Sequence, residues 1–407
     1  MHRPPLIVLD SSNRQENSWP LVAARPELVM RCDSRTFVTV LCREGRVIKS
    51  WDDPMKVLGE LDSPASDCAV AAGQRPGRWA GFLSYDLGRL FERLPSTAES
   101  DLQLPLFAFA FCPASRKDET DLSRETTFDP IDPRHEECRS TFSSAAYRAT
   151  VNRVLEYIQA GDIFQANLSQ RFTVRQRQSA AHIYDRLLKI SPARFGGLLD
   201  FGDFALICNS PELFLKVFID EKTGSRRVIT RPIKGTRPRK DGMEVELRDS
   251  IKDQAELNMI VDLERNDLGK VCRIGAVKVT EARTVESHPT VYHGVATVEG
   301  TLRPDVGFVD LLRATFPGGS VTGAPKIRAM EIIEELEPVR RGPYCGAIGS
   351  IASDGSLEFN VAIRTMIVKD GLIHIPVGGG IVADSDAAEE YDETLVKAKA
   401  MFAALGD

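Results

Sequence analysis

The sequence lacks the features that would direct a chain into a membrane, out of the cell or onto a nucleic acid. None of its apolar runs approaches the roughly 20 residues that a membrane-spanning helix needs. Residues 1–10 do not have the charged and apolar segments of a secretory signal. The formal net charge of −6 argues against sequence-independent binding to nucleic acid. We therefore expect a cytoplasmic protein with neither a membrane nor a nucleic acid as its partner.

The sequence also lacks the patterns of a disulfide or zinc site and of a nucleotide-binding loop. The eight cysteines are scattered and include no CxxC pair, so we expect buried free thiols rather than disulfides or a zinc site. The GxxxxGK[ST] sequence of a phosphate-binding loop is also absent, which disfavours nucleotide chemistry.

The chain does have an ordinary globular composition over a considerable length. Hydrophobic residues make up 43% and charged residues 27% of the 407 residues, enough for one large core or two interlocked ones. Residues 1–112 are typical of short strands and loops, and residues 113–142 of a polar connector that contains several prolines. Residues 143–407 carry the chemical motifs described below. We expect the first and third parts to interlock.

Hydrophobic periodicity predicts that strands and helices alternate through the third part. Helices are predicted at residues 143–160, 181–190, 243–268, 306–315, 326–336 and 387–405. Strands are predicted at residues 36–42, 80–85, 163–173, 213–218, 226–230, 277–280, 291–299, 347–352 and 356–368, with a strand and then a turn across 197–211. Several of these strands form hairpins, which favour antiparallel sheet. The predicted fold class is therefore α+β, with helices packed on antiparallel sheets.

Lys234 lies in a short basic segment, Thr230–Arg239, between an isoleucine and a glycine. We expect this segment to form a turn, where a lysine is more often solvated than functional. Two acidic helices and two glycine-rich loops follow it along the chain. An amine held among carboxylates and anion-binding loops suits covalent or electrostatic catalysis on a small polyanion.

The first acidic helix contains Asp253 and Glu256, three residues apart and hence on one face. Carboxylates on one side of a groove are suitable ligands for Mg²⁺, which takes few protein ligands and keeps water or substrate oxygens. An exposed, purely solvated helix face is an equally good interpretation of this segment alone.

The second acidic helix presents Glu390, Glu393 and Lys397 on one face. The segment before it contains three consecutive glycines, of which Gly379 and Gly380 are the last two. We expect a loop there, whose backbone approaches a ligand closely because glycine has no Cβ atom. A glycine-rich loop followed by carboxylates on one face is a stronger signal than either feature alone.

A third element, Phe316–Lys326, contains three more glycines just ahead of a predicted helix. Pro325 suits the first turn of that helix, so Thr322 and Gly323 lie next to its N-terminus. Free N–H groups and the helix dipole make such a position receptive to a carboxylate or a phosphate.

Three single residues add to these segments. Arg364 alternates with apolar neighbours in a predicted strand, and an inward-facing arginine needs an anion. His293 either donates a hydrogen bond to a ligand or satisfies a polar network in the core. Glu212 follows a predicted turn and opens a strand, and on its own it would pass as a surface residue.

Taken together, these segments resemble the chorismate-utilising enzymes, which include anthranilate synthase component I, aminodeoxychorismate synthase component I, and the isochorismate and salicylate synthases. The resemblance extends from about residue 143 to residue 404, and residues 79–92 continue it into the first part. Its most specific stretches are DLERNDLGKV (residues 262–271), FPGGSVTGAPKIRAMEIIEELEP (residues 316–338) and GGGIVADS (residues 378–385). The implied fold is that of anthranilate synthase component I, with large antiparallel sheets in a layered core and helices outside.

Two positions resemble the aminodeoxychorismate synthase branch of this family. Anthranilate and isochorismate synthases have alanine where this chain has Lys234. Isochorismate-type enzymes have a water-activating lysine where Gln165 stands. The alternative within the family is anthranilate synthase component I, and a partner-binding subunit without activity is a further alternative from a different class.

The resemblance also implies the ligands and their residues. Chorismate would lie with its ring carboxylate on Mg²⁺ held by Glu256 and Glu393, with Asp253 and Glu390 nearby. The substrate-binding set implied is Gln165, Thr322, Gly323, Arg364, Gly379, Gly380 and Lys397, and His293 joins the catalytic residues.

The implied reaction is a two-step amination. The amine of Lys234 would add at ring carbon 2 as the hydroxyl leaves carbon 4, and Glu212 would protonate that hydroxyl. Ammonia would then attack carbon 4 and expel the lysine, giving 4-amino-4-deoxychorismate, the precursor of 4-aminobenzoate in folate biosynthesis. The ammonia is expected to come from a separate glutamine amidotransferase subunit.

Overall fold

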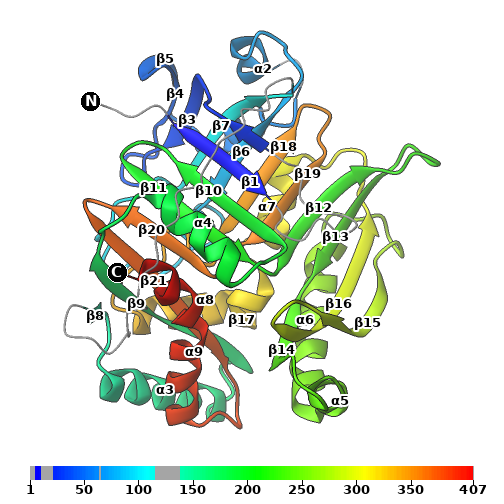
Figure 1. The fold of residues 1–407 in the computed structure, drawn as a ribbon. Helices are drawn as coiled ribbons and strands as arrows, with labels where there is room; N and C mark the ends of the chain where they lie inside the picture. The colour runs from blue at the N-terminus through cyan, green and yellow to red at the C-terminus, as the bar shows by residue number, and fades with distance from the viewer. Residues whose placement is uncertain (1–4, 11–21, 64–65, 115–137, 407) are drawn as a thin grey trace.

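The protein is described here by a computed structural model of residues 5–10, 22–63, 66–114 and 138–406 (Figure 1). Within these residues the chain forms two large sheets, and all of their strand pairs are antiparallel. The α+β class predicted from the hairpins is therefore confirmed. Most of the expected connector, residues 115–137, lies outside the described part of the chain.

The first sheet has nine strands in the order β17-β9-β21-β20-β11-β10-β1-β2, with β8 paired to β9. Its strands are β1 (Leu6–Asp10), β2 (Val22–Ala24), β8 (Arg139–Ser140), β9 (Gln165–Arg175), β10 (Phe195–Asp200), β11 (Phe204–Ser210), β17 (Gly323–Ala324), β20 (Thr365–Lys369) and β21 (Leu372–Ile381).

The second sheet has twelve strands in the order β14-β16-β13-β12-β19-β18-β6-β7-β3-β4-β5, with β15 paired to β16. Its strands are β3 (Leu28–Cys32), β4 (Thr39–Arg43), β5 (Arg46–Trp51), β6 (Gly77–Leu83), β7 (Phe107–Pro113), β12 (Leu213–Ile219), β13 (Arg226–Arg231), β14 (Ile233–Pro238), β15 (Lys278–Ser287), β16 (Val291–Thr301), β18 (Ala347–Ala352) and β19 (Leu357–Val361). Both sheets thus combine strands from before and after the connector.

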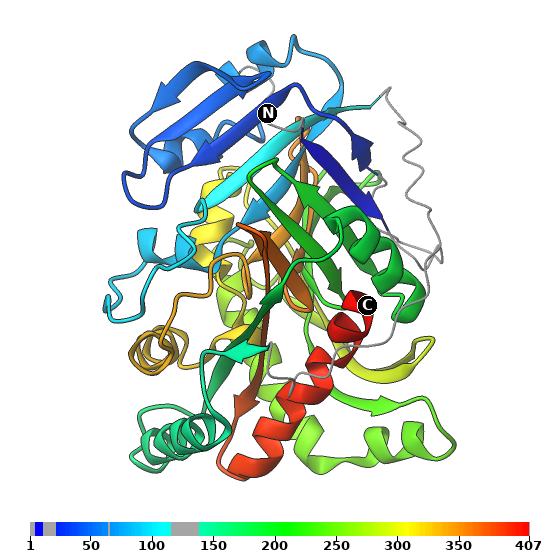
Figure 2. The same ribbon diagram turned by 60° about the vertical axis from the view of Figure 1, so that its left-hand side comes forward.

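The helices lie outside the pair of sheets (Figures 1 and 2). They are α1 (Pro54–Leu58), α2 (Asp67–Ala71), α3 (Ser144–Gln159), α4 (Ala180–Ile190), α5 (Met243–Asp249), α6 (Ile251–Gly269), α7 (Phe308–Thr315), α8 (Lys326–Leu336) and α9 (Ala387–Leu405), with short 3₁₀ turns η1 (Tyr85–Leu90) and η2 (Gly319–Val321). No helix of the described residues is long and apolar enough to cross a membrane.

Apolar side chains from both sheets meet in a shared core. One buried cluster joins residues of β1, β10 and β11 to residues of β6, β7 and β18. Phe82 of β6 meets Phe204 of β11 edge-on, with ring centroids 5.9 Å apart. Separate clusters pack α4 and α9 on the outer face of the first sheet, and α6 and α7 on that of the second. All eight cysteines are free thiols and six are buried, as their spacing predicts.

Two elements that were each predicted as one continuous segment are divided into two in the structure. The helix predicted across residues 243–268 is broken at Ser250, which takes an extended conformation and accepts a hydrogen bond from the Asp253 N–H at 3.2 Å. This is an ordinary N-cap, so a second helix begins there. The strand predicted across residues 356–368 is also broken: β19 belongs to the second sheet and β20 to the first.

Candidate active site

Two of the crossings that the chain makes between the sheets lie side by side. The first leads from β11 through Glu212 into β12, and the second leads from β19 through Arg364 into β20. The Val361 N–H donates to the Glu212 carbonyl at 3.0 Å, and the Asn209 N–H donates to the Arg364 carbonyl at 3.1 Å. These bonds bring residues about 150 positions apart in sequence to one place between the sheets.

Arg364 takes a backbone φ of +51°, the left-handed region that non-glycine residues rarely adopt. Arg364 therefore lies between β19 and β20. The strand predicted there from the alternation of apolar residues is wrong at this position. The Arg364 guanidinium donates to the Lys397 carbonyl at 3.1 Å. Burial lowers the pKa of Arg364, opposed by Tyr344 and Glu393. A desolvated guanidinium of this kind is suited to an anionic ligand.

Lys234 lies in β14 and not in a turn, which corrects the expectation for this segment. Its side chain is half-buried and lies near Glu212 of the first crossing and near charged side chains of α6 and α9. Burial lowers the pKa of Lys234, aided by Lys397, while Glu256, Glu212 and Glu393 oppose the shift. These five residues form what we call the lysine cluster. A lowered pKa gives a larger share of the neutral amine, the form that attacks carbon.

Glu212 is buried, with 5% of its surface exposed. Burial raises the pKa of Glu212 to about 7, while the Ser320 hydroxyl bonded to it, Lys234 and the Ile233 N–H act in the opposite direction. At neutral pH a large share of this carboxyl therefore carries a proton. It is the one group of the lysine cluster that is suited to act as an acid.

Gln165 begins β9 and is fully buried, and neither its amide nitrogen nor its amide oxygen has a hydrogen-bond partner among the described residues. A Cβ atom at Gly380 would lie 2.3 Å from the Gln165 amide nitrogen and 3.1 Å from the Lys234 amine. The Gln165 amide and the Lys234 amine therefore lie over the same glycine. Buried amides are normally hydrogen-bonded, so this one is suited to a polar ligand.

The glycines expected in a loop lie instead within β21, where Gly379 pairs with Leu168 and Gly380 with Asn167 of β9. Three charged side chains of α9 cover Gly379, with Glu390, Glu393 and Lys397 atoms 3.2, 3.5 and 3.6 Å from the position of a Cβ atom. The three residues predicted on one helix face thus do lie together. A side chain at Gly379 would enter the space that these groups share, so the glycine leaves room for them.

The α9 side chains are already paired in part. Lys397 contacts Glu393 at 2.5 Å and donates to the Gly378 carbonyl at 2.9 Å. Glu390 accepts a hydrogen bond from the Ser385 hydroxyl at 2.6 Å. Lys397 holds the pKa of Glu393 below its usual range in spite of burial, whereas burial raises the pKa of Glu390.

The carboxylates predicted to hold a metal differ in whether they already bond to other groups of the protein. Asp253 accepts a hydrogen bond from Arg237 at 2.9 Å. Glu256 has no hydrogen bond or ion pair within the described residues, and burial raises its pKa, with Lys234 opposing. No three His, Cys, Asp or Glu side chains of the described chain converge as metal ligands. A desolvated carboxylate without a partner, facing Glu393, is nevertheless the kind of donor that a divalent cation requires.

Thr322 and Gly323 lie where the sequence predicts, directly before α8, and both are buried. The Thr322 hydroxyl donates to the Gly318 carbonyl at 2.9 Å. Gly323 has a φ of +147°, and a Cβ atom there would lie 2.1 Å from the Gln165 carbonyl oxygen. The glycine is thus required for the close approach of β17 to β9.

His293 lies in β16, and its Nδ1 is 2.9 Å from the Thr236 hydroxyl of β14. Its ring is 5.0 Å from that of His288. Burial lowers the pKa of His293 to about 3, and His288 and Arg364 contribute in the same direction. The ring is therefore neutral at physiological pH, able to donate or accept a hydrogen bond but not to act as a cation.

Two residues of the site were missed from the sequence. Ser320 is hydrogen-bonded to Glu212. Its position in the glycine-rich segment is the one sequence feature that could have pointed to it. Glu264 of α6 accepts a hydrogen bond from the Gly319 N–H at 3.1 Å, and its other oxygen is buried without a partner among the described residues. Burial raises the pKa of Glu264 to about 7, opposed by Lys326.

The burial of Glu264 predicts how stability depends on pH. Its pKa is 4.5 when unfolded and about 7 when folded, so the carboxyl's contribution to the free energy of unfolding falls as the pH rises between these values. The change in the free energy of unfolding caused by Glu264→Gln should therefore be more stabilising at pH 8 than at pH 5, by about 2 kcal/mol. Chemical unfolding at both pH values measures this difference.

A matched control is Asp262→Asn, because Asp262 lies on the same helix with its side chain 71% exposed. Its effect should be the same at both pH values. Equal effects of Glu264→Gln at pH 5 and pH 8 would contradict the prediction.

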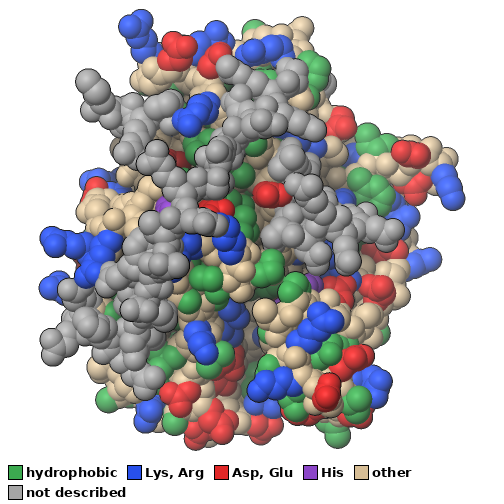
Figure 3. Space-filling model, viewed as in Figure 1, with side chains coloured by type: hydrophobic (Ala, Val, Ile, Leu, Met, Phe, Trp, Pro, Cys, Tyr) green, Lys and Arg blue, Asp and Glu red, His purple; other side chains and the backbone are tan. Residues whose placement is uncertain are grey.

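Seen as in Figure 1, the surface is hollowed at its lower centre, between α9 on one side and α5 and α6 on the other (Figure 3). The lysine cluster draws its side chains from both sides, with Glu393 and Lys397 on α9 and Glu256 on α6. The arrangement combines an amine, a carboxylic acid, further carboxylates and an arginine. It is suited to covalent chemistry on an anionic substrate.

The comparisons with known proteins agree with this chemistry. Residues 49–403 match the family model described as chorismate binding enzyme. Anthranilate synthase component 1 1 of Haloarcula marismortui is 39% identical, and the alignment covers 96% of this chain and 86% of that protein. Aminodeoxychorismate synthase component 1 of Escherichia coli is 35% identical, with 97% of this chain and 92% of that protein covered.

The solved structures show the same relationship. Anthranilate synthase component I from Streptococcus pneumoniae matches with a TM-score of 0.77 at 29% identity, covering 99% of this chain and 93% of that one. The menaquinone-specific isochorismate synthase of Escherichia coli shares the fold, with a TM-score of 0.69 at 14% identity over 100% of this chain and 89% of its own. This chain belongs to the family of chorismate binding enzymes and has the fold of anthranilate synthase component I.

Proposed function

We propose that this protein is component I of an aminodeoxychorismate synthase, which converts chorismate and ammonia to 4-amino-4-deoxychorismate. The observation that carries this proposal is the amine of Lys234, which lies beside Gln165 over Gly380 and shares its surroundings with the protonated Glu212. The lowered pKa of Lys234 suits a nucleophile, and the raised pKa of Glu212 suits an acid.

In the first step, the neutral amine of Lys234 forms a C–N bond at ring carbon 2. The ring double bonds shift, the C4–O bond breaks, and the hydroxyl leaves as water after it takes the proton of Glu212. The amine gives up one proton to the Glu212 carboxylate as it becomes a secondary amine, so Glu212 is a neutral acid again at the end of this step. Covalent catalysis of this kind divides one difficult displacement into two easier ones.

In the second step, ammonia forms a bond to carbon 4, the double bonds shift back, and the C2–N bond to Lys234 breaks. The lysine takes the proton of Glu212 and leaves as an amine, and the proton lost from ammonia then restores the neutral acid at Glu212. The sum is chorismate plus ammonia giving aminodeoxychorismate plus water. The Gln165 amide, which has no hydrogen-bond partner among the described residues and lies over the same glycine, would bind the incoming ammonia.

The second candidate function is anthranilate synthase component I. It is favoured by relatives of that name, including the Thermus thermophilus protein at 40% identity over 81% of this chain and 77% of its own length. The amine at position 234, which lies 3.1 Å from the position of a Cβ atom on Gly380, argues for the first candidate. The resemblance implies alanine at this position in the anthranilate synthases.

The residues present are suited to Mg²⁺ as a cofactor. Glu256 is desolvated and unpaired in the described chain, and Glu393 faces it across the lysine cluster. These two carboxylates would hold the ion, with Asp253 and Glu390 nearby, and Glu393 would then share its charge between the ion and Lys397. The bound ion would neutralise a carboxylate of the substrate and so help to orient the ring.

The metal proposal predicts different effects for two neighbouring carboxylates. Glu256→Gln should weaken the apparent affinity for Mg²⁺ by about 100-fold or more, because it removes a ligand. Asp253→Asn should weaken it by at most about 10-fold, because Asp253 is held by Arg237. Titration of EDTA-treated protein with Mg²⁺, followed by activity and by calorimetry, measures both. Equal affinities of the two variants would contradict the assignment.

We propose that ammonia comes from a separate glutamine amidotransferase subunit, since the relatives are named as component 1 of their enzymes. Free ammonium at mildly basic pH would replace that subunit, at lower efficiency.

Product analysis tests the proposed function. Purified protein is incubated with chorismate, Mg²⁺ and ammonium, and products are separated by liquid chromatography with mass detection. The proposal predicts aminodeoxychorismate, which becomes 4-aminobenzoate when an aminodeoxychorismate lyase is added. Anthranilate as the product would overturn it in favour of the second candidate.

A further inference from the structure

Arg341 is a buried arginine beside the candidate site that none of the proposed steps uses. It is 6% exposed and follows α8. Its guanidinium donates to the Val321 carbonyl at 2.8 Å and to the Asn167 carbonyl at 2.7 Å. It also forms a two-point ion pair with Glu337, at 2.9 and 2.6 Å. Four hydrogen bonds therefore come from one planar group.

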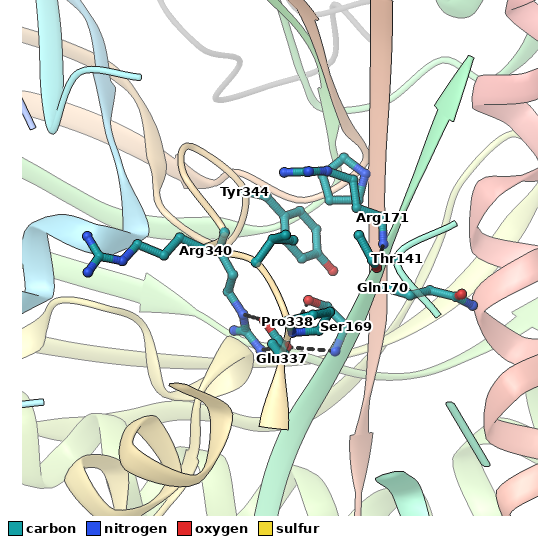
Figure 4. A pocket seen from close by; sticks show the side chains of 11 residues that line it. Thr141, Ser169, Gln170, Arg171, Glu337, Pro338, Arg340 and Tyr344 are labelled. Carbon is teal, nitrogen blue, oxygen red and sulfur yellow. Dashed lines mark hydrogen bonds and ion pairs between the residues drawn. The ribbon is translucent and has the colours of Figure 1, made fainter. Parts of the chain in front are cut away.

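Glu337 fixes this guanidinium to the first sheet. One of its carboxylate oxygens accepts hydrogen bonds from both the N–H and the hydroxyl of Ser169, each at 2.8 Å. Ser169 belongs to β9, as do Gln165 and Asn167. The pocket in Figure 4 is lined by Ser169, Glu337 and Tyr344, and the dashed lines from Glu337 mark these bonds. Arg341 and Glu337 are therefore held from several sides.

The two carbonyls that Arg341 joins lie on either side of one strand junction. Asn167 is in β9, and Val321 directly precedes Thr322 and β17. At this junction the Asn167 N–H donates to the Thr322 carbonyl at 2.8 Å, and β17 then pairs with β9 through Gly323 and Ala166. Arg341 thus adds a second connection next to the first bond of a strand pair only two residues long.

The same guanidinium also contacts the N-terminal part of the chain. It lies over the ring of Tyr85, 4.7 Å from the ring centroid. The next residue, Asp86, accepts a hydrogen bond from the Gly342 N–H at 3.0 Å. Residues from η1, β9, η2 and the end of α8 therefore meet at Arg341.

From this geometry we propose that Arg341 and Glu337 form a brace that positions Gln165 and the Thr322–Gly323 segment relative to each other. Arg341 is a positioning residue, since it touches neither Lys234 nor the space over Gly380. The inference rests on the proposed function, because Gln165 and Thr322 matter only if that site binds chorismate and ammonia. Without the brace, β17 and the start of β9 are joined by a short ladder alone, and the amide of Gln165 loses its fixed distance from the substrate.

Lysine cannot replace this arginine. A single ammonium group cannot reach two carbonyls and a carboxylate with the fixed geometry of a planar fork. Arg341→Lys keeps the charge and most of the volume, so it removes the geometry while it leaves the ion pair to Glu337 possible. It is therefore the sharpest test of positioning.

The experiment compares Arg341→Lys with Arg340→Lys in the full chain with chorismate, Mg²⁺ and ammonium. Arg340 is the adjacent arginine and donates to the Ser96 hydroxyl at 2.8 Å, away from β9. In protein shown to be folded by circular dichroism, Arg341→Lys should lower kcat by about 100-fold, as a displacement of about 1 Å does. Arg340→Lys should retain kcat within about twofold. A purely structural role would lower the melting temperature and leave kcat of the folded protein unchanged.

Wild-type kcat in folded Arg341→Lys would overturn the inference. If Arg341→Lys does not fold, kcat of folded Glu337→Gln is compared with that of Arg340→Lys instead. Glu337→Gln keeps the shape of the carboxylate and removes the charge that orients the guanidinium. If the wild-type protein makes no aminodeoxychorismate, the proposed function fails instead, and the two failures are thus distinguished.

Discussion

Lys234→Ala should abolish formation of aminodeoxychorismate, with a fall in kcat on the order of 10³-fold or more. The amine is the proposed nucleophile, and the neighbouring amine of Lys397 is already paired with Glu393 and bound to the Gly378 carbonyl. Chorismate binding should change little, because we propose other groups for the carboxylates of the substrate. Steady-state kinetics with ammonium, measured as product by mass detection, gives both parameters.

The control for this substitution is Lys240→Ala. Lys240 follows the same strand by two residues but is exposed to solvent. Its removal should leave kcat within about twofold of the wild-type value. Undiminished production of aminodeoxychorismate by Lys234→Ala would show that the reaction needs no covalent lysine.

Glu212→Gln should lower kcat by about 10²- to 10⁴-fold, the range by which a positioned acid or base accelerates proton transfer. The amide keeps the shape of the carboxyl and can still accept the hydrogen bond of Ser320, but it has no acidic proton to give the leaving hydroxyl. The KM for chorismate should remain close to that of the wild type. Full retention of kcat would remove Glu212 from the role of acid.

The same residue predicts the pH dependence of the wild-type rate. Glu212 must be protonated, and with a pKa of about 7 its protonated fraction falls as the pH rises above that value. Lys234 must be neutral, and its neutral fraction rises with pH through its lowered pKa. The rate should therefore pass through a maximum, with an alkaline limb that belongs to Glu212.

In Glu212→Gln this alkaline limb should disappear, while the acidic limb stays. Glu358→Gln is a suitable control, since Glu358 is buried too but is paired with Lys216 at 3.2 Å in the second sheet. Its profile should keep both limbs. An alkaline limb that persists in Glu212→Gln would assign that ionisation to another group.

Local features of the site could be read from the sequence because they depend on residues close together in the chain. The spacing of Glu390, Glu393 and Lys397 places them on one helix face, and the structure brings all three to Gly379. The N-cap at Ser250 also has a local signal, an aspartate followed by a serine. Its effect on the helix was missed because the apolar periodicity continues across it.

The remaining features depend on contacts between distant residues. The burial of Glu212, and hence its raised pKa, follows from the crossing of the chain between two sheets, which no local pattern encodes. The left-handed backbone of Arg364 has the same origin. Arg341 and Asn167 are 174 positions apart, so their hydrogen bond becomes visible only in the folded chain.

The most direct test of the account is to look for the covalent adduct on Lys234. The protein is incubated with chorismate and Mg²⁺ without ammonia, quenched, digested and examined by mass spectrometry. The account predicts a peptide containing Lys234 whose mass is increased by that of chorismate less one water, and it predicts that ammonium chases this species to aminodeoxychorismate. An enzyme that makes aminodeoxychorismate without any such adduct, or with the adduct on another residue, would contradict it.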